Sequence, residues 1–135
     1  MSLPRHADCF SVRVTYARQR LGLRGEDIAC FELEQLGYVL LERRYRSRFG
    51  EIDVVAQDGT TVAFVEVKTK TDGRFGDPVE MVDERKRRRL VSMAEEYVSG
   101  HALHSTPCRF DVVAIDASIE PPKVTVYKDA FRPGW

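Results

Sequence analysis

The chain of 135 residues lacks several features that would assign it to a class of protein at once. Its three cysteines, Cys9, Cys30 and Cys108, are odd in number and far apart, so their spacing matches neither a zinc site nor a disulfide framework. The apolar runs are much shorter than a membrane span, and the N-terminus has no apolar core of the signal-peptide type. We therefore expect a soluble, cytoplasmic protein with free thiols and no membrane partner.

Net charge is also absent, because 21 basic residues balance 21 acidic ones. The total therefore gives no argument for a polyanionic partner, but the distribution does, since the basic residues are clustered. One cluster holds four arginines between Arg43 and Arg48, and the other runs from Arg85 to Arg89. The acids lie elsewhere, several of them inside apolar runs.

Hydrophobic residues make up 43% of the chain, which is enough for one compact core. We expect a loose arm over residues 1–16 and a single domain over residues 17–135. Periodicity, turn and capping signals predict, in chain order, a helix over 15–36 ended by Gly37, strands over 38–41, 51–56 and 61–68, a helix over 83–98, and strands over 109–115 and 124–127. The order α-β-β-β-α-β-β, with no internal repeat, predicts an α/β fold in which helices cover a mixed sheet.

Three charged residues interrupt the two apolar strands that flank the turn signal Asp58-Gly59: Asp53, Glu66 and Lys68. Side chains alternate between the two faces of a strand. A two-residue loop at the turn would pair Glu51 with Glu66, whereas a four-residue loop would pair Asp53 with Glu66. Under either closure the three charged residues share one face of the hairpin.

Charged groups in so apolar a hairpin are costly unless they are paired or bound to metal. Glu66 and Lys68 alone are equally well explained by a simple ion pair. Asp53 changes the balance, because two facing carboxylates repel and a divalent cation with oxygen ligands, Mg²⁺ or Mn²⁺, removes the repulsion. Such a cation activates water for attack on a phosphodiester, and a neighbouring lysine stabilises the developing negative charge. The sequence thus predicts a metal-dependent phosphodiesterase site.

Five segments together resemble the YraN family, also called UPF0102, which is grouped with the Holliday-junction-resolvase-like and restriction-endonuclease-like nucleases of the PD-(D/E)XK type. The segments are GLRGEDIA (22–29), RRYR (43–46), GEID (50–53), FVEVK (64–68) and RFDVV (109–113). The resemblance spans almost everything from Leu21 to Phe131. It implies a restriction-endonuclease-like α/β/α sandwich with a central mixed sheet. It also implies that Asp53 and Glu66 bind the metal and that Lys68 is the catalytic lysine.

The resemblance leaves the rest of the site open. Glu26 resembles the helix glutamate that completes the metal site of resolvases, and its alternative is an exposed helix acid. Glu51 is either a supporting carboxylate behind the metal ligands or one half of a solvent-facing cross-strand pair. Lys86 matches a lysine common in the family's second helix and is a candidate phosphate contact. Arg44 and Lys70 depart from the family pattern, which often has Asn and Arg there, yet both keep or add positive charge.

The clustered cations are candidates for nucleic-acid contact. A basic strand that leads into a metal site would hold phosphodiesters over the carboxylates, and cations in the first turns of a helix oppose its dipole unless an anion binds there. A solvated strand edge and a solvated helix face are the alternatives. Alternation sends Arg43 to one face and the other three arginines of its cluster to the opposite face. The candidate set is Arg43, Arg44, Arg46, Arg48, Lys86, Arg88 and Arg89.

We therefore expect a Mg²⁺- or Mn²⁺-dependent endonuclease that acts on DNA, branched or structured DNA included, and does not read bases. The alternatives are a nucleic-acid-binding protein that keeps the nuclease fold without cutting, and a scaffold whose acidic cluster is structural. Junction-cleaving members of the broader fold act as dimers, so the resemblance makes a homodimer a state to test. The three histidines, His6, His101 and His104, lie in the termini and a loop, and we assign them no catalytic role.

Overall fold

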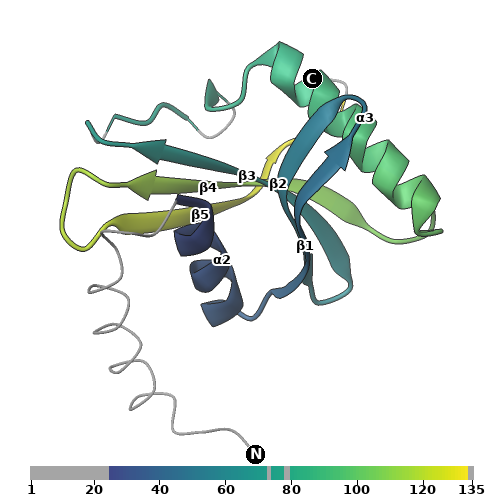
Figure 1. Ribbon diagram of the computed structural model, residues 1–135, viewed down its shortest axis with the longest axis horizontal. Coiled ribbons are helices and arrows are strands. Elements are labelled where there is room, and N and C mark those ends of the chain that lie inside the picture. Colours follow the sequence, from purple (N-terminus) through teal and green to yellow (C-terminus); the bar gives the residue numbers. More distant parts are fainter. Residues whose placement is uncertain (1–24, 73, 78–79, 134–135) are drawn as a thin grey trace, which may run out of the picture.

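The computed structural model of the chain describes residues 25–72, 74–77 and 80–133 (Figure 1). Its elements are α2 (Gly25–Gln35), β1 (Val39–Ser47), β2 (Gly50–Asp58), β3 (Thr61–Lys70), α3 (Glu84–Gly100), β4 (Cys108–Asp116) and β5 (Lys123–Phe131). This is the predicted order α-β-β-β-α-β-β. The arm predicted over residues 1–16, and the part of the first predicted helix before Gly25, lie outside the described residues.

All five strands belong to one mixed sheet, in which their spatial order β1-β2-β3-β4-β5 equals their order in the chain. Neighbouring strands are antiparallel except β3 and β4, which are parallel. Parallel neighbours need a crossover connection, and α3 lies within the connection between them. The mixed α/β sheet predicted from the sequence is confirmed.

Each face of the sheet carries its own apolar core, one under α3 and one under α2, as the placement of the two helices shows (Figure 1). The larger side chains of the α3 core are Ile52, Phe64, Leu90, Met93, Tyr97, Phe110 and Phe131. Those of the α2 core are Ile28, Leu33, Tyr38, Val54, Val65, Val113 and Ile115. β3 is buried from Val62 to Glu66, so this strand is central and covered on both sides.

β1 is longer than the predicted strand over 38–41, because its arginine-rich half also pairs with β2, as far as Ser47 opposite Gly50. Arg43 and Arg44 are accommodated there by acids at the start of α2. The prediction that alternation sends Arg43 and Arg44 to opposite faces is wrong. Arg44 has a positive φ of 54°, which breaks the alternation, and both arginines contact Glu26. Charge and irregular backbone on an edge strand also discourage pairing with another chain.

The β2–β3 hairpin closes through Gly59 and Thr60, with Asp58 paired to Thr61 and Gln57 to Val62. Gly59 has a φ of 64°, a conformation that glycine adopts without steric cost. This register is the one predicted for a four-residue loop. One additional pair, Asp58 with Thr61, shortens that loop to two residues. The ladder ends at Val54 opposite Val65.

α3 begins after Asp83, whose Oδ1 accepts a hydrogen bond from the amide of Lys86 at 2.8 Å, a typical helix N-cap. The helix predicted over 83–98 is therefore confirmed, with two further residues at its end. In the described part of the chain, no helix is long and apolar enough to cross a membrane.

The cysteines in the described ranges are free thiols, Cys30 buried and Cys108 exposed, and Cys9 lies outside these ranges. Burial raises the pKa of the Cys30 thiol to about 11, so this thiol stays protonated and unreactive at neutral pH.

Candidate active site

The predicted site lies where β2 and β3 separate. Beyond the last ladder pair, Oδ2 of Asp53 accepts a hydrogen bond from the amide of Val67 at 2.8 Å, so a side chain takes the place of a strand carbonyl. Residues two apart on a regular strand face the same side, but Ile52 faces the α3 core and Val54 faces the α2 core. The backbone of β2 therefore turns between these two residues. The turn directs the Asp53 carboxylate toward β3, where the second predicted carboxylate lies.

Asp53 is partly buried, and its pKa is raised from 3.8 to about 6. Burial is the main cause, and the negative charge of Glu66 is the next. The Val67 amide and Lys86 act in the opposite direction, and Glu26 adds a smaller upward effect. The structure thus brings Asp53 and Glu66 close enough to repel each other, as the hairpin pattern predicts.

Glu66 is a buried acid in the middle of the sheet, with only 3% of its surface exposed. Its Oε2 lies 2.7 Å from Nζ of Lys86, which reaches across from α3. Its Oε1 is buried and has no hydrogen-bond partner within the part of the chain that the structure describes. An orphaned carboxylate oxygen is costly, and its position beside a second carboxylate is suited to a divalent cation.

Lys68 follows Glu66 by two residues on β3 and is half-buried. It lies near the start of α3, since its charge is among those that lower the pKa of Asp83, after the main effect of the Lys86 amide. Glu66 contacts α3 and Lys68 lies near its N-cap, so both are on the sheet face that α3 covers, in agreement with strand alternation.

Glu26 is held by arginines: its Oε1 lies 2.6 Å from Nε of Arg44 and 3.2 Å from Nη2 of Arg43. It is still near enough to Asp53 to raise the pKa of that group. Glu51 pairs instead with Arg46 across the β1–β2 ladder, at 3.3 Å and largely in solvent. Of the two readings of Glu51, the structure therefore shows the solvent-facing cross-strand pair.

The predicted nucleic-acid-binding cations divide into two groups. Arg43, Arg44 and Lys86 are engaged by acids of α2 and β3. The rest are exposed: Arg46 and Arg48 at 83% and 80% of their side chains, Arg88 in a loose pair with Glu84 at 3.8 Å, and Arg89. The exposed group is free to reorient toward a phosphate backbone.

Within residues 25–72, 74–77 and 80–133, no group of three or more His, Cys, Asp or Glu side chains is arranged to hold a metal ion. Asp53 and Glu66 form a pair of oxygen ligands, with one oxygen of Glu66 on Lys86. A metal at this pair therefore needs further oxygens from water, from substrate, or from Glu26 after release by its arginines.

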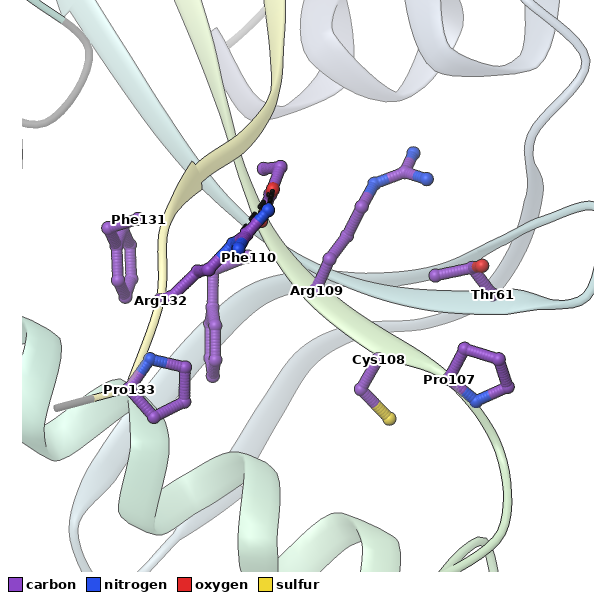
Figure 2. A pocket seen from close by; sticks show the side chains of 9 residues that line it. Thr61, Pro107, Cys108, Arg109, Phe110, Phe131, Arg132 and Pro133 are labelled. Atoms are coloured by element: carbon purple, nitrogen blue, oxygen red, sulfur yellow. Dashed lines mark hydrogen bonds and ion pairs between the residues drawn. The ribbon is translucent and has the colours of Figure 1, made fainter.

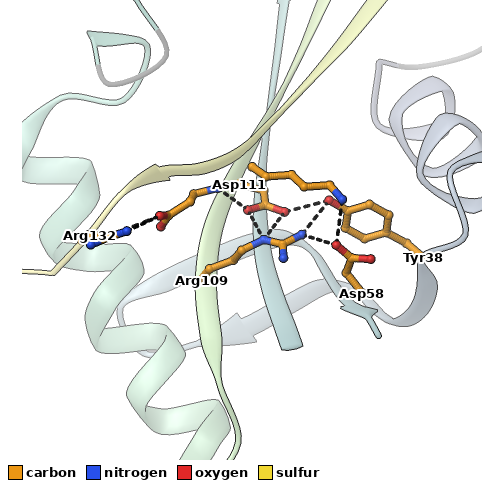
Figure 3. Close-up of polar contacts among 7 residues, drawn as sticks. Tyr38, Asp58, Arg109, Asp111 and Arg132 are labelled. Carbon is orange, nitrogen blue, oxygen red and sulfur yellow. Dashed lines mark hydrogen bonds and ion pairs between the residues drawn. The ribbon is translucent and has the colours of Figure 1, made fainter. Parts of the chain in front are cut away.

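Sequence reasoning missed a second polar cluster, which lies at the end of the sheet where β2 and β5 finish and β4 begins (Figure 3). Asp111 is fully buried there and accepts hydrogen bonds from Tyr38 Oη at 3.0 Å, Arg109 Nε at 2.9 Å and the Asp129 amide at 2.9 Å. Arg109 also donates to Asp58 at 2.6 Å. The sequence signal for it was Asp111 within the apolar run Phe110–Ile115, in the segment RFDVV (109–113) that resembles the family.

A cavity of about 620 Å³ borders this cluster (Figure 2). Its walls include Cys108, Phe110 and Phe131, together with Arg109 and Arg132. Both arginines are already held by carboxylates, Arg109 by Asp58 and Asp111 and Arg132 by Asp129. The cluster therefore ties strand ends together, and it lies away from the Asp53–Glu66 pair.

Comparison with known proteins gives one consistent result. The model of the uncharacterised protein family UPF0102 matches residues 25–115. A UPF0102 protein of Moorella thermoacetica is 44% identical over 120 residues, covering 87% of this chain and 100% of the relative. A UPF0102 protein of Xanthomonas campestris is 46% identical over 117 residues, covering 86% of this chain and 94% of the relative.

Proposed function

The chain belongs to the uncharacterised protein family UPF0102, and we propose that it is a metal-dependent endonuclease that hydrolyses phosphodiester bonds in DNA, branched or structured DNA included. One observation carries the proposal: a buried Glu66 with an unsatisfied oxygen lies beside Asp53, whose pKa is raised to about 6. A buried carboxylate with an unsatisfied oxygen, next to a second carboxylate in an apolar sheet, destabilises the fold. Such an arrangement is typical of a site that a ligand completes.

The residues present fit Mg²⁺ or Mn²⁺. Asp53 and Glu66 offer hard oxygen ligands, and Glu26 is the candidate third carboxylate. When bound, the cation would polarise a phosphate oxygen and lower the pKa of a water molecule. The unsatisfied Oε1 of Glu66 is the atom that supports this assignment.

The chain's own groups perform the remaining tasks. The Val67 amide fixes Asp53, so that this carboxylate does not have to be ordered during the reaction. Lys86 keeps Glu66 next to a positive charge until a metal binds. Lys68, two residues after Glu66 on β3, would stabilise negative charge on the phosphate as the bond breaks.

DNA is the substrate class best suited to the exposed cations. Arg46 and Arg48 at the end of β1, and Arg88 and Arg89 on α3, carry mobile positive charge without an apparatus for reading bases. Contacts of this type recognise the backbone and the shape of a duplex. Symmetric cutting of a four-way junction would require two copies of the chain, so a homodimer on junction DNA is part of the proposal.

Cleavage of linear, flap and four-way-junction DNA in Mn²⁺ tests the proposal. We expect cutting by the wild type and a loss of at least about a hundredfold in Asp53→Asn and Lys68→Met, the usual scale for one electrostatic group at a phosphoryl site. Glu51→Gln and Lys123→Met are matched controls, because both residues are surface charges outside the pair. Activity that persists in both site variants would exclude this site as the nuclease centre.

A second candidate is a DNA-binding protein that keeps the fold and does not cut. It is favoured by Lys86, which occupies one oxygen of Glu66, and by the lack of a third carboxylate beside the pair in the described residues. This candidate predicts DNA retention that weakens steeply with salt, and no cutting in Mg²⁺ or Mn²⁺.

A further inference from the structure

A small cavity of about 160 Å³ lies between the end of β3 and the segment that follows it. Its lining residues are Lys68, Lys70, Arg74, Phe75, Gly76, Glu80 and Met81. We call it the loop pocket. It shares Lys68 with the candidate active site, and Lys68 follows Glu66 by two residues on β3, so a group bound in the pocket contacts the proposed catalytic lysine.

The cations of the loop pocket differ from most other cations in the described residues, because they form no ion pair. In the described ranges, none of Lys68, Lys70 and Arg74 has a carboxylate oxygen within 4.0 Å, whereas Arg43, Arg109 and Lys128 do. Three positive groups around one cavity, none of them in an ion pair within the described ranges, favour an anionic ligand.

One acid lies in the wall of the loop pocket. Glu80 Oε1 accepts a hydrogen bond from the Asp77 amide at 3.4 Å, and it packs so close to Gly76 that a Cβ there would come within 2.8 Å of it. The carboxylate is thus held against the loop backbone. Three cations and one carboxylate leave the pocket with a formal excess of two positive charges.

The excess of two positive charges in the loop pocket favours one of two kinds of phosphate. An internal phosphodiester carries one negative charge, whereas a terminal phosphate monoester carries about −1.5 to −2 at neutral pH and presents three acceptor oxygens. Phe75 and Met81 add an apolar wall for the attached nucleoside. We propose that the loop pocket binds the terminal phosphate monoester of a DNA strand and thereby anchors a strand end beside Asp53 and Glu66. The inference rests on the proposed function in one respect, that the ligand is DNA.

The test measures binding apart from cutting. Fluorescence anisotropy in EDTA compares one short single-stranded DNA in three forms, with a 5′-phosphate, with a 3′-phosphate and with neither. We expect one phosphorylated form to bind on the order of tenfold more tightly than the unmodified strand, the effect of gaining one charge-assisted contact. Whichever form gains identifies the polarity of the anchored end.

The variants are Lys70→Ala and Arg74→Ala, both exposed and outside the proposed catalytic set. We expect each to remove most of the phosphate-dependent gain while Tm remains that of the wild type. Arg132→Ala is the control, because Arg132 is an exposed cation in a different part of the molecule. If the wild type binds DNA without any gain from a terminal phosphate, or with a gain that Arg132→Ala reduces equally, the inference is overturned.

Failure of the proposed nuclease function can be distinguished from failure of the loop pocket to bind phosphate. If no DNA is bound or cut, the same comparison is made with thymidine 5′-monophosphate against thymidine. Selective binding of the monophosphate that Lys70→Ala abolishes supports the pocket without a nuclease, whereas equal binding overturns the pocket. Cutting of DNA without any phosphate preference overturns the pocket and keeps the nuclease.

Discussion

Lys86 Nζ lies 2.7 Å from Glu66 Oε2, a contact that joins α3 to the buried acid of the central strand. The lysine is partly exposed and the glutamate almost wholly buried, with side-chain exposures of 33% and 4%. The cation can therefore swing out to solvent while the anion cannot. Glu66 consequently depends on an external positive charge, supplied by Lys86 in the free protein and replaceable by a metal.

Removal of that lysine gives a first prediction. Lys86→Met should lower the free energy of unfolding in EDTA near pH 8 by about 2 kcal/mol, because it leaves Glu66 buried without a cation. Urea unfolding measures the loss, and Mn²⁺ should recover part of it. Arg88→Met, which removes only an exposed i,i+4 pair, should cost less than about 0.5 kcal/mol. Equal losses in the two variants would contradict a special role for Lys86.

Asp53 gives a prediction about pH. Its pKa is about 6 in the folded chain against 3.8 in the unfolded one, so the folded state holds the proton more tightly. Asp53 therefore favours folding most below about pH 4, and this contribution is lost as the pH rises through about 6. Asp53→Asn, whose amide oxygen can still accept from Val67, should raise the free energy of unfolding near pH 8 by roughly 1–3 kcal/mol, and by little near pH 4.

Asp58→Asn is the control for that experiment, since hydrogen bonds from Arg109 and Lys128 lower the pKa of Asp58. Its stabilising effect is present above the unfolded pKa of 3.8 and is lost as the pH falls. Asp58→Asn should therefore destabilise near pH 8, the opposite sign. A stabilisation by Asp53→Asn that is the same at both pH values would refute the titration argument.

Metal binding should be visible as thermal stabilisation. We expect Mn²⁺ to raise Tm by an amount equivalent to about 2.7 kcal/mol at a hundred times Kd, since the ion binds only the folded chain. Differential scanning calorimetry at about pH 8, where Asp53 is ionised, should show this shift in the wild type and in Glu51→Gln. It should show no shift in Glu66→Gln. The shift should shrink below about pH 6, where Asp53 takes up a proton. A full shift in Glu66→Gln would place the ion elsewhere.

The Asp111 cluster should govern stability rather than chemistry. Asp111→Ala leaves Arg109 without its buried partner and should cost roughly 3–5 kcal/mol. Tyr38→Phe removes two hydrogen bonds, one donated to Asp111 and one accepted from Arg109, and should cost about 1–2 kcal/mol. Denaturant unfolding measures both. Cutting per folded molecule should be unchanged in Tyr38→Phe, because the cluster lies away from Asp53. A selective loss of cutting there would connect the cluster to catalysis.

Gly25 should be required at the start of α2 for steric reasons. A Cβ at this position would clash with Oγ1 of Thr69 at the end of β3. Gly25→Ala should therefore destabilise by about 1–3 kcal/mol, and most of that loss should vanish in a Thr69→Ala background. Urea unfolding of the four chains of this double-mutant cycle checks the coupling. Purely additive effects would show that the contact is not the cause.

The fold was largely predictable from the sequence, because local signals and long-range packing agree in most of the chain. The apolar runs in β3 and β4, the Asp58-Gly59 turn and the helical periodicity over 83–98 each point to the element that forms. β1 was underestimated, since nothing local favours a strand through Arg43–Ser47. Pairing with β2 and neutralisation by α2 stabilise that half of the strand, and both are tertiary effects.

The candidate site was predictable in its residues and less so in its contacts. Alternation placed Glu66 and Lys68 on one face, and the structure agrees. It could not predict that β2 turns at Asp53, because that depends on packing against two cores. It also could not predict that Lys86 would reach Glu66, since the helix and the strand are brought together only by the complete fold. The roles of these residues in metal binding and cutting stay predictions.

The hydrogen bond from Val67 to Asp53 makes one amide a built-in reporter. Any event that changes the charge on the carboxylate, whether protonation, ion binding or an approaching phosphate, changes the field at that single N–H. In a ¹H–¹⁵N spectrum the Val67 resonance should therefore move first and furthest, without a label or a substitution. The occupancy of the site can in this way be followed in the unaltered protein.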